Sequence, residues 1–98
     1  MDIKKNLSGK NLCLALEGRL DTNTSVQLEE EIKNLPSDLQ KLTLDFAKLE
    51  YISSAGLRVI LTAQKKMTSQ GNMVLTNVNE SIMDIFEITN FVDILSFE

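Results

Sequence analysis

The stretch LDFAKLEYISSAGLRVIL, residues 44–61, joins two hydrophobic patterns of different period. Apolar and polar residues alternate from Leu42 to Phe46, which is typical of a strand. After the pair Ser53-Ser54, apolar residues recur at helical spacing from Leu57 to Met67. The segment therefore predicts a strand, a loop, and a helix that begins near the two serines.

The residues before this stretch predict two strands and a helix. Alternation is clear in 12–17, and a shorter strand over 2–7 precedes it, joined by a turn at 8–11 that contains glycine. Thr24 and Gln27 match a capping box, so we expect the first helix to begin there. Pro36 disfavours helical geometry at the preceding residue and should end that helix.

The residues after this stretch predict one more strand, one more helix and a short tail. Gly71 is placed to cap the C-terminus of the second helix. The run 72–78 is apolar on both sides, which favours a strand covered on both faces. Asn79 can cap a third helix, and the apolar residues 91–95 suggest a last short strand.

The resulting element order predicts a small α/β domain that spans residues 1–98. Alternating strands and helices favour a mostly parallel sheet with crossover helices. The first two strands are joined by a short turn, so they should form an antiparallel hairpin at one edge. We expect a mixed, mostly parallel sheet with this N-terminal hairpin strand and three to four helices.

Composition narrows the possible functions. The chain has 98 residues, no histidine, one cysteine and a net charge of −4. Without histidine, hydrolytic catalysis and metal binding have few candidate groups, so we expect no enzyme, no metal and no cofactor. No basic run could neutralise phosphates, so neither nucleic acid nor a membrane is expected as a partner. No signal-peptide pattern begins the chain, and we expect a cytoplasmic location.

Ser53 and Ser54 stand where the second helix should begin. Backbone N–H groups are free at a helix N-terminus, and the helix dipole favours negative charge there, so a phosphate on a serine could be held. A simpler interpretation is that one serine is an N-cap and Gly56 permits close packing. On these residues alone, the N-cap interpretation is the more common one.

Two motifs favour the phosphorylation interpretation over the simple N-cap. Asp45, the pair Tyr51-Ile52 and the run 54–61, SAGLRVIL, resemble the central motif of the STAS domain family, which sulfate-transporter tails and anti-sigma-factor antagonists share. The run 18–21, GRLD, is similar to the family's glycine-to-aspartate motif before its first helix. The resemblance extends over nearly the whole chain in length and element order.

The resemblance implies a phosphorylation-controlled switch in transcription regulation and the stress response. In similar antagonists the serine at the position of Ser54 accepts the phosphate. The unphosphorylated form binds an anti-sigma factor, which then releases its sigma factor. That anti-sigma factor is often also the serine-protein kinase, and a PP2C-type phosphatase resets the switch. The resemblance implies a partner-binding surface that comprises Asp21, Ser53, Ser54, Ala55, Gly56 and Arg58.

Ser53 departs from the family pattern, which has an aspartate at this position. The change makes Ser53 an alternative acceptor and leaves a second function open. STAS-like domains also act as constitutive scaffolds or subunits, in stressosome-like or lipid-transport-associated assemblies, without serine phosphorylation. Asp21 and Arg58 likewise have simpler interpretations, as a turn residue and a solvated side chain. We expect Asp45 to pin the loop that follows its strand by accepting backbone hydrogen bonds.

Overall fold

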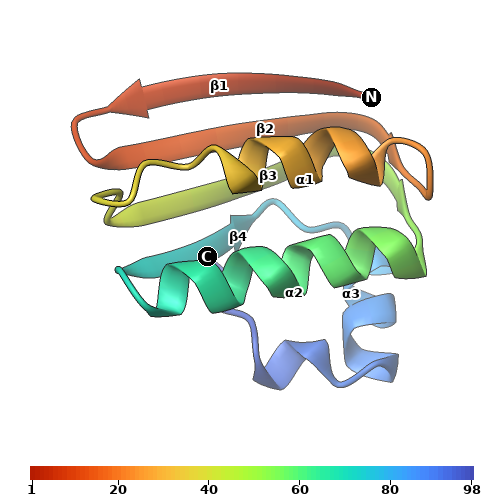
Figure 1. Ribbon diagram of the computed structural model, residues 1–98. Coiled ribbons are helices and arrows are strands. Elements are labelled where there is room, and N and C mark those ends of the chain that lie inside the picture. The colour runs from red at the N-terminus through yellow and green to blue at the C-terminus, as the bar shows by residue number, and fades with distance from the viewer.

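The computed structural model describes residues 1–98 and places four strands in one sheet (Figure 1). The strands are β1 (Asp2–Ser8), β2 (Asn11–Leu20), β3 (Lys41–Ile52) and β4 (Asn72–Thr76), in the spatial order β1-β2-β3-β4. The pairing of β1 with β2 is antiparallel, and the other two pairings are parallel. The predicted mixed sheet with an N-terminal hairpin is confirmed.

Three helices accompany the sheet: α1 (Ser25–Lys33), α2 (Ser54–Thr68) and α3 (Glu80–Ile88). Helices α1 and α2 lie side by side over one face of the sheet, and α3 lies beyond β4 (Figure 1). The covered face receives every second residue of β2, Leu12, Leu14 and Leu16, all of which are buried. The opposite face of the sheet carries no helix. Side chains of β2 and β3 on that face are half-buried or exposed, whereas Val74 of β4 is buried there.

The predicted last strand over 91–95 is wrong. Phe91–Asp93 form a single 3-10 turn instead, because Asn90 before it has φ 64°, a left-handed conformation that turns the chain out of line. Only one bridge joins this tail to the sheet, between Phe97 and Leu75. Two backbone hydrogen bonds join the tail to Leu75, at 2.9 and 3.0 Å, and the centroid of the Phe97 ring lies 5.7 Å from that of Phe86. Strand pairing and side-chain packing therefore both hold the tail.

Strand β3 continues through the residues predicted to form a loop. It reaches Ile52 because its pairing with β2 shifts register twice, between Ala15 and Glu17 and between Gly18 and Arg19. Each shift leaves an extra residue on β3, which is the geometry of a β-bulge. Bulges interrupt strict alternation, so the buried residues Phe46, Leu49 and Ile52 follow at intervals of three.

The predicted capping box at Thr24 is also wrong. Thr24 has helical backbone angles and makes no side-chain cap to α1. Its hydroxyl accepts from the Asp21 N–H at 2.9 Å and donates to the Arg19 carbonyl at 2.6 Å. The hydroxyl therefore bonds to the end of β2 and not to the first turn of α1. At its other end, α1 stops at Lys33, ahead of Pro36.

Gly71 follows α2 but is not its C-cap, contrary to the prediction from the sequence. Helix α2 ends at Thr68 with Ser69 as its C-cap, and the Gly71 N–H donates to the Met67 carbonyl at 2.7 Å. A Cβ atom on Gly71 would lie 1.9 Å from the Gln40 carbonyl oxygen. Glycine is required here because two backbone segments meet closely, not because φ is positive.

Candidate partner-binding and phosphorylation site

The site forms where α2 begins at the end of β3. Ser53 is the N-cap: its backbone is extended, and its hydroxyl accepts from the Gly56 N–H at 3.2 Å. Its own N–H donates to the Leu20 carbonyl at 2.9 Å, which ties the start of α2 to the end of β2. Ser54 is the first helical residue and is exposed. The two serines thus have different environments, because Ser53 holds the local structure and Ser54 faces outward.

Gly56 fits a narrow gap behind this turn. It is buried, and a Cβ atom there would lie 2.8 Å from the side chain of Leu20 and 3.0 Å from that of Ile52. The first turn of α2 therefore rests directly on the ends of β2 and β3. Because Gly56 is buried, we assign it to packing and remove it from the partner surface that the resemblance implied.

Asp21 organises the segment between β2 and α1. Its carboxylate oxygen Oδ1 accepts from the N–H groups of Thr24, at 2.9 Å, and Asn23, at 3.0 Å. The hydrogen bond from the Thr24 backbone is the main reason that the pKa of Asp21 lies below its usual value, and the Thr24 hydroxyl, the Asn23 N–H and the Arg19 charge act in the same direction. Asp21 therefore supports the turn and carries a negative charge at neutral pH.

Arg19 and Tyr51 form a stacked pair beside this turn, which sequence reasoning did not assign to the site. They are paired residues on β2 and β3, and the guanidinium carbon of Arg19 lies 4.2 Å from the Tyr51 ring centroid. Such a cation–π contact holds a planar cation in place at the surface. The only sequence signal was that both residues adjoin the motifs, Arg19 within GRLD and Tyr51 before the serines.

The structure gathers the remaining predicted site residues at one end of the molecule. The Asp21 turn and the start of α2 are neighbours, both on the right of Figure 1. Ser54 and Arg58 are exposed, whereas Ser53 and Ala55 are half-buried. The first turn of α2 contains no acidic residue. Together with Arg19 and Tyr51 these residues form what we call the α2-start surface: Arg19, Asp21, Tyr51, Ser53, Ser54, Ala55 and Arg58.

Asp45 lies inside β3, on the sheet face that has no helices. Its Oδ1 accepts from the Ala47 N–H and from the Asn77 side chain, both at 3.0 Å. The expected backbone hydrogen bond is confirmed, but it stabilises the first bulge of β3 and not a loop. Asp45 is therefore a structural residue, separate from the α2-start surface.

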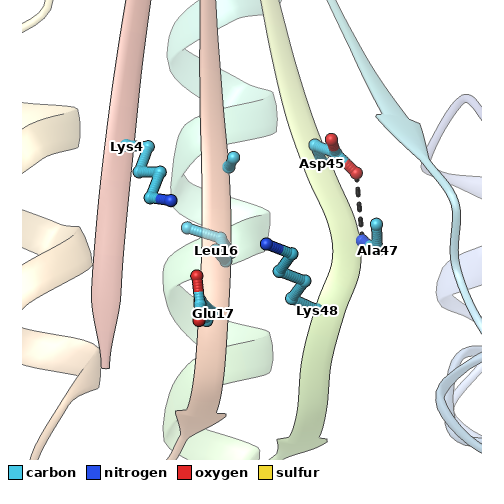
Figure 2. Close-up of a pocket in the computed structure, with 7 residues that line it drawn as sticks. Lys4, Leu16, Glu17, Asp45, Ala47 and Lys48 are labelled. Atoms are coloured by element: carbon cyan, nitrogen blue, oxygen red, sulfur yellow. Dashed lines mark hydrogen bonds between the residues drawn. The ribbon is translucent and has the colours of Figure 1, made fainter.

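A hollow of about 210 Å³ opens beside Asp45 on this uncovered face. The side chains of Lys4 and Lys48 extend toward β2 from either side of it, and Glu17 and Asp45 complete its charged lining (Figure 2). Burial raises the pKa of the nearby Cys13 thiol, and the Asp45 charge adds to the effect. The thiol is protonated at neutral pH, and the balanced charges of the hollow favour neither a cation nor an anion.

Two further findings concern the whole chain. No three Cys, Asp or Glu side chains are grouped so that they could hold a metal ion. No helix combines the length and the apolar character that crossing a bilayer would require.

The chain belongs to the STAS domain family, whose model matches residues 2–98. A Bordetella bronchiseptica protein named as the anti-sigma factor antagonist BtrV is 35% identical over 85% of this chain and 73% of its own length. The anti-sigma-B factor antagonist of Bacillus subtilis strain 168 is 27% identical over 97% of this chain and 86% of its own length.

Solved structures agree with the fold at low sequence identity. A Thermotoga maritima protein described as an anti-sigma factor antagonist superposes with a TM-score of 0.88 at 19% identity, and the match covers 97% of this chain and 84% of the other. The antagonist SpoIIAA in its unphosphorylated form gives a TM-score of 0.84 at 15% identity, covering 99% and 88%. These likenesses establish the architecture, a two-layer α/β domain of the STAS type.

Proposed function

We propose that this chain is an anti-sigma-factor antagonist that binds an anti-sigma factor through the α2-start surface and is released when Ser54 is phosphorylated. The observation that carries the proposal is the exposed Ser54 on the first turn of α2, within a motif of this family. Relatives of similar length that are named as anti-sigma-factor antagonists support the same role. The chain acts by binding and not by catalysis.

The geometry favours Ser54 over Ser53 as the acceptor. The Ser53 hydroxyl accepts from the Gly56 N–H, and the residue is half-buried against the end of β2. A kinase would have to disrupt this cap in order to reach Ser53. Ser54 is exposed and can be approached without disturbing the helix start. Ser53 also caps α2 as an aspartate would, so the departure from the family pattern preserves the local structure.

The switch works through charge rather than through a change of shape. A phosphate adds a charge of about −1.5 to −2 and three acceptor oxygens to a small exposed side chain. A partner that approaches with acidic or apolar groups would then meet repulsion and a desolvation cost. A change of about 3 kcal/mol in the binding free energy corresponds to more than a hundredfold in affinity.

The proposed partners follow from this chemistry. The anti-sigma factor is the binding partner and, as a serine-protein kinase, also transfers the γ-phosphoryl group of ATP to the Ser54 hydroxyl, releasing ADP. A PP2C-type phosphatase removes the phosphate again. The cytoplasm, where transcription takes place, is the proposed site of action.

Phosphorylation and binding can be tested together. Mass spectrometry after incubation with ATP and candidate anti-sigma kinases should find phosphate on Ser54 of the wild type and of Ser53→Asp, which keeps a capping oxygen. The variant Ser54→Ala should bind the anti-sigma factor tightly, and Ser54→Asp should bind it weakly. Equally tight binding by both Ser54 variants would reject the charge mechanism.

Ser53 itself supports a second candidate function. The family's aspartate beside the acceptor is missing, and a STAS domain without phosphorylation would serve as a constitutive scaffold or subunit, as in stressosome-like or lipid-transport-associated assemblies. The phosphorylation assay separates the two functions. Absence of phosphate with every kinase tried, in the wild type and in Ser53→Asp, would favour the scaffold.

A further inference from the structure

The chain has two arginines, and the structure gives them different surroundings. The guanidinium of Arg19 is stacked on Tyr51, with its carbon 4.2 Å from the ring centroid. Arg58 is exposed on α2 and belongs to none of the three ion pairs, which all join a lysine to a glutamate. Arg58 is thus a cation on the α2-start surface that no acidic side chain neutralises.

Helix geometry directs Arg58 toward Ser54. The two residues are four positions apart on α2, so they lie one above the other on the same face. Long side chains in helices lean toward the N-terminus of the helix, which brings the Arg58 guanidinium over the turn that contains Ser54. Both residues are exposed, so a larger group on Ser54 has room to meet it.

We propose that Arg58 is the intramolecular counter-ion of phosphorylated Ser54, pairing with the phosphate across one helical turn. The inference rests on the proposed function, in which Ser54 carries the phosphate. A guanidinium fork matches phosphate oxygens in a bidentate manner, which a lysine ammonium does not. The pair has a second consequence for binding: phosphorylation withdraws the Arg58 cation from the partner together with the Ser54 hydroxyl.

Other charged groups near the start of α2 do not take this role. Asp21, at the end of β2, is negative and would oppose a phosphate, and its oxygen is already occupied by backbone N–H groups. Arg19 is held on Tyr51. Glu50, the residue before that tyrosine on β3, is negative and cannot pair with a phosphate. On α2, Lys65 and Lys66 lie in the last turn, far from Ser54. Arg58 is therefore the cation best placed to reach the phosphate.

The test installs phosphoserine at position 54 during translation, so that no kinase is needed. A ³¹P NMR titration then measures the second ionisation of the phosphate, whose ordinary pKa is about 6. A paired cation favours the doubly charged form, so Arg58→Gln should raise this midpoint by about 0.3 to 0.5 of a pH unit, and Arg58→Lys should raise it less. The difference should shrink at high ionic strength.

Two variants complete the design. Lys65→Gln removes a charge from the same helix, out of reach of Ser54, and should leave the midpoint unchanged. Arg19→Gln should shift it by less than Arg58→Gln does. An unchanged midpoint in Arg58→Gln, or a larger shift in Arg19→Gln, would overturn the proposal. Failure of the proposed function is detected separately, as an absence of Ser54 phosphorylation by kinases or equal binding of the two Ser54 variants.

Discussion

The guanidinium of Arg19 stacks on the ring of Tyr51, 4.2 Å from its centroid, at the same end of the sheet as the exposed Ser54. The two residues face each other because β2 and β3 shift register between Gly18 and Arg19. Without that bulge, Arg19 would oppose Glu50, the residue before Tyr51. The bulge thus replaces a cross-strand ion pair by a cation held on an aromatic face.

The stacked arginine should contribute to partner binding. We expect Arg19→Gln to weaken the affinity for the anti-sigma factor about fivefold, since arginine is a common interface hot spot and the Tyr51 ring holds its guanidinium in place before the partner arrives. Isothermal titration calorimetry measures the change. The control is Lys10→Gln, which removes a positive charge from the β1–β2 turn at the opposite end of the molecule. Equal losses in both variants would point to net charge alone.

The Ser53 cap should stabilise the fold independently of binding. Loss of an N-cap costs about 1 kcal/mol, so Ser53→Ala should lower the melting temperature by about 4–8 °C in a domain of this size. Ser53→Asp should retain the wild-type value, because a carboxylate accepts the same Gly56 N–H. Ser54→Ala serves as the matched control and should melt within about 1 °C of the wild type, since exposed positions contribute little. Thermal unfolding followed by circular dichroism decides between these outcomes.

The two closely packed glycines should differ in their tolerance of a methyl group. Gly56→Ala places a Cβ atom near the side chains of Leu20 and Ile52 and 3.0 Å from the Leu20 carbonyl oxygen, and should cost about 1–3 kcal/mol of unfolding free energy. Gly71→Ala meets the Gln40 backbone at 1.9 Å and should cost more. Urea denaturation of both variants gives the comparison, and a smaller loss in Gly71→Ala would contradict it.

The Asp21 carboxylate should make stability depend on pH. Its folded-state pKa is lowered, mainly by the Thr24 backbone, so the stability that its charge contributes is complete above the unfolded pKa of about 3.9. This contribution is lost as the pH falls through the lower folded pKa. Asp21→Asn keeps an acceptor oxygen but removes the charge, and it should be less stable than the wild type at pH 7.

The control for this prediction compares the wild type with Asp21→Asn at acidic pH. The difference in unfolding free energy between wild type and Asp21→Asn should narrow below about pH 4, where Asp21 is protonated in the unfolded chain before it is protonated in the folded protein. Urea titrations at pH 7 and pH 3 measure both values. A difference that stays constant across this range would show that the carboxylate charge has no role in stability.

Much of the fold could be predicted because its determinants are local. The alternation in β2 and the helical spacing in α2 arise from one buried face each, and they correctly indicated the mixed sheet with its hairpin. The bulges of β3 could not be predicted in this way. Their buried residues, Phe46, Leu49 and Ile52, follow the spacing of three that a loop or helix also produces. The 3-10 turn after Asn90 was missed because its apolar residues have strand propensity, while the backbone at Asn90 decides the outcome.

Residues of the candidate site could be predicted only where they lie within a short sequence motif. Ser54, Ser53 and Asp21 lie in short motifs, and the structure brings them to one surface. Arg19 and Tyr51 are separated by 32 positions and meet through strand register, which no local pattern records. Gly56 was assigned to the surface because it adjoins Ser54, and its burial depends on how closely α2 approaches Leu20.

The tight seat of Gly56 against Leu20 has a consequence for the timing of the proposed switch. A helix packed this closely on a strand end gives Ser54, the proposed acceptor, a rigid support, so the proposed switch needs no backbone rearrangement for docking or release. Under this proposal the phosphorylated and unphosphorylated forms have the same backbone conformation and differ only in the phosphoester. Under this scheme the delay between a signal and its response belongs entirely to the two opposing enzymes.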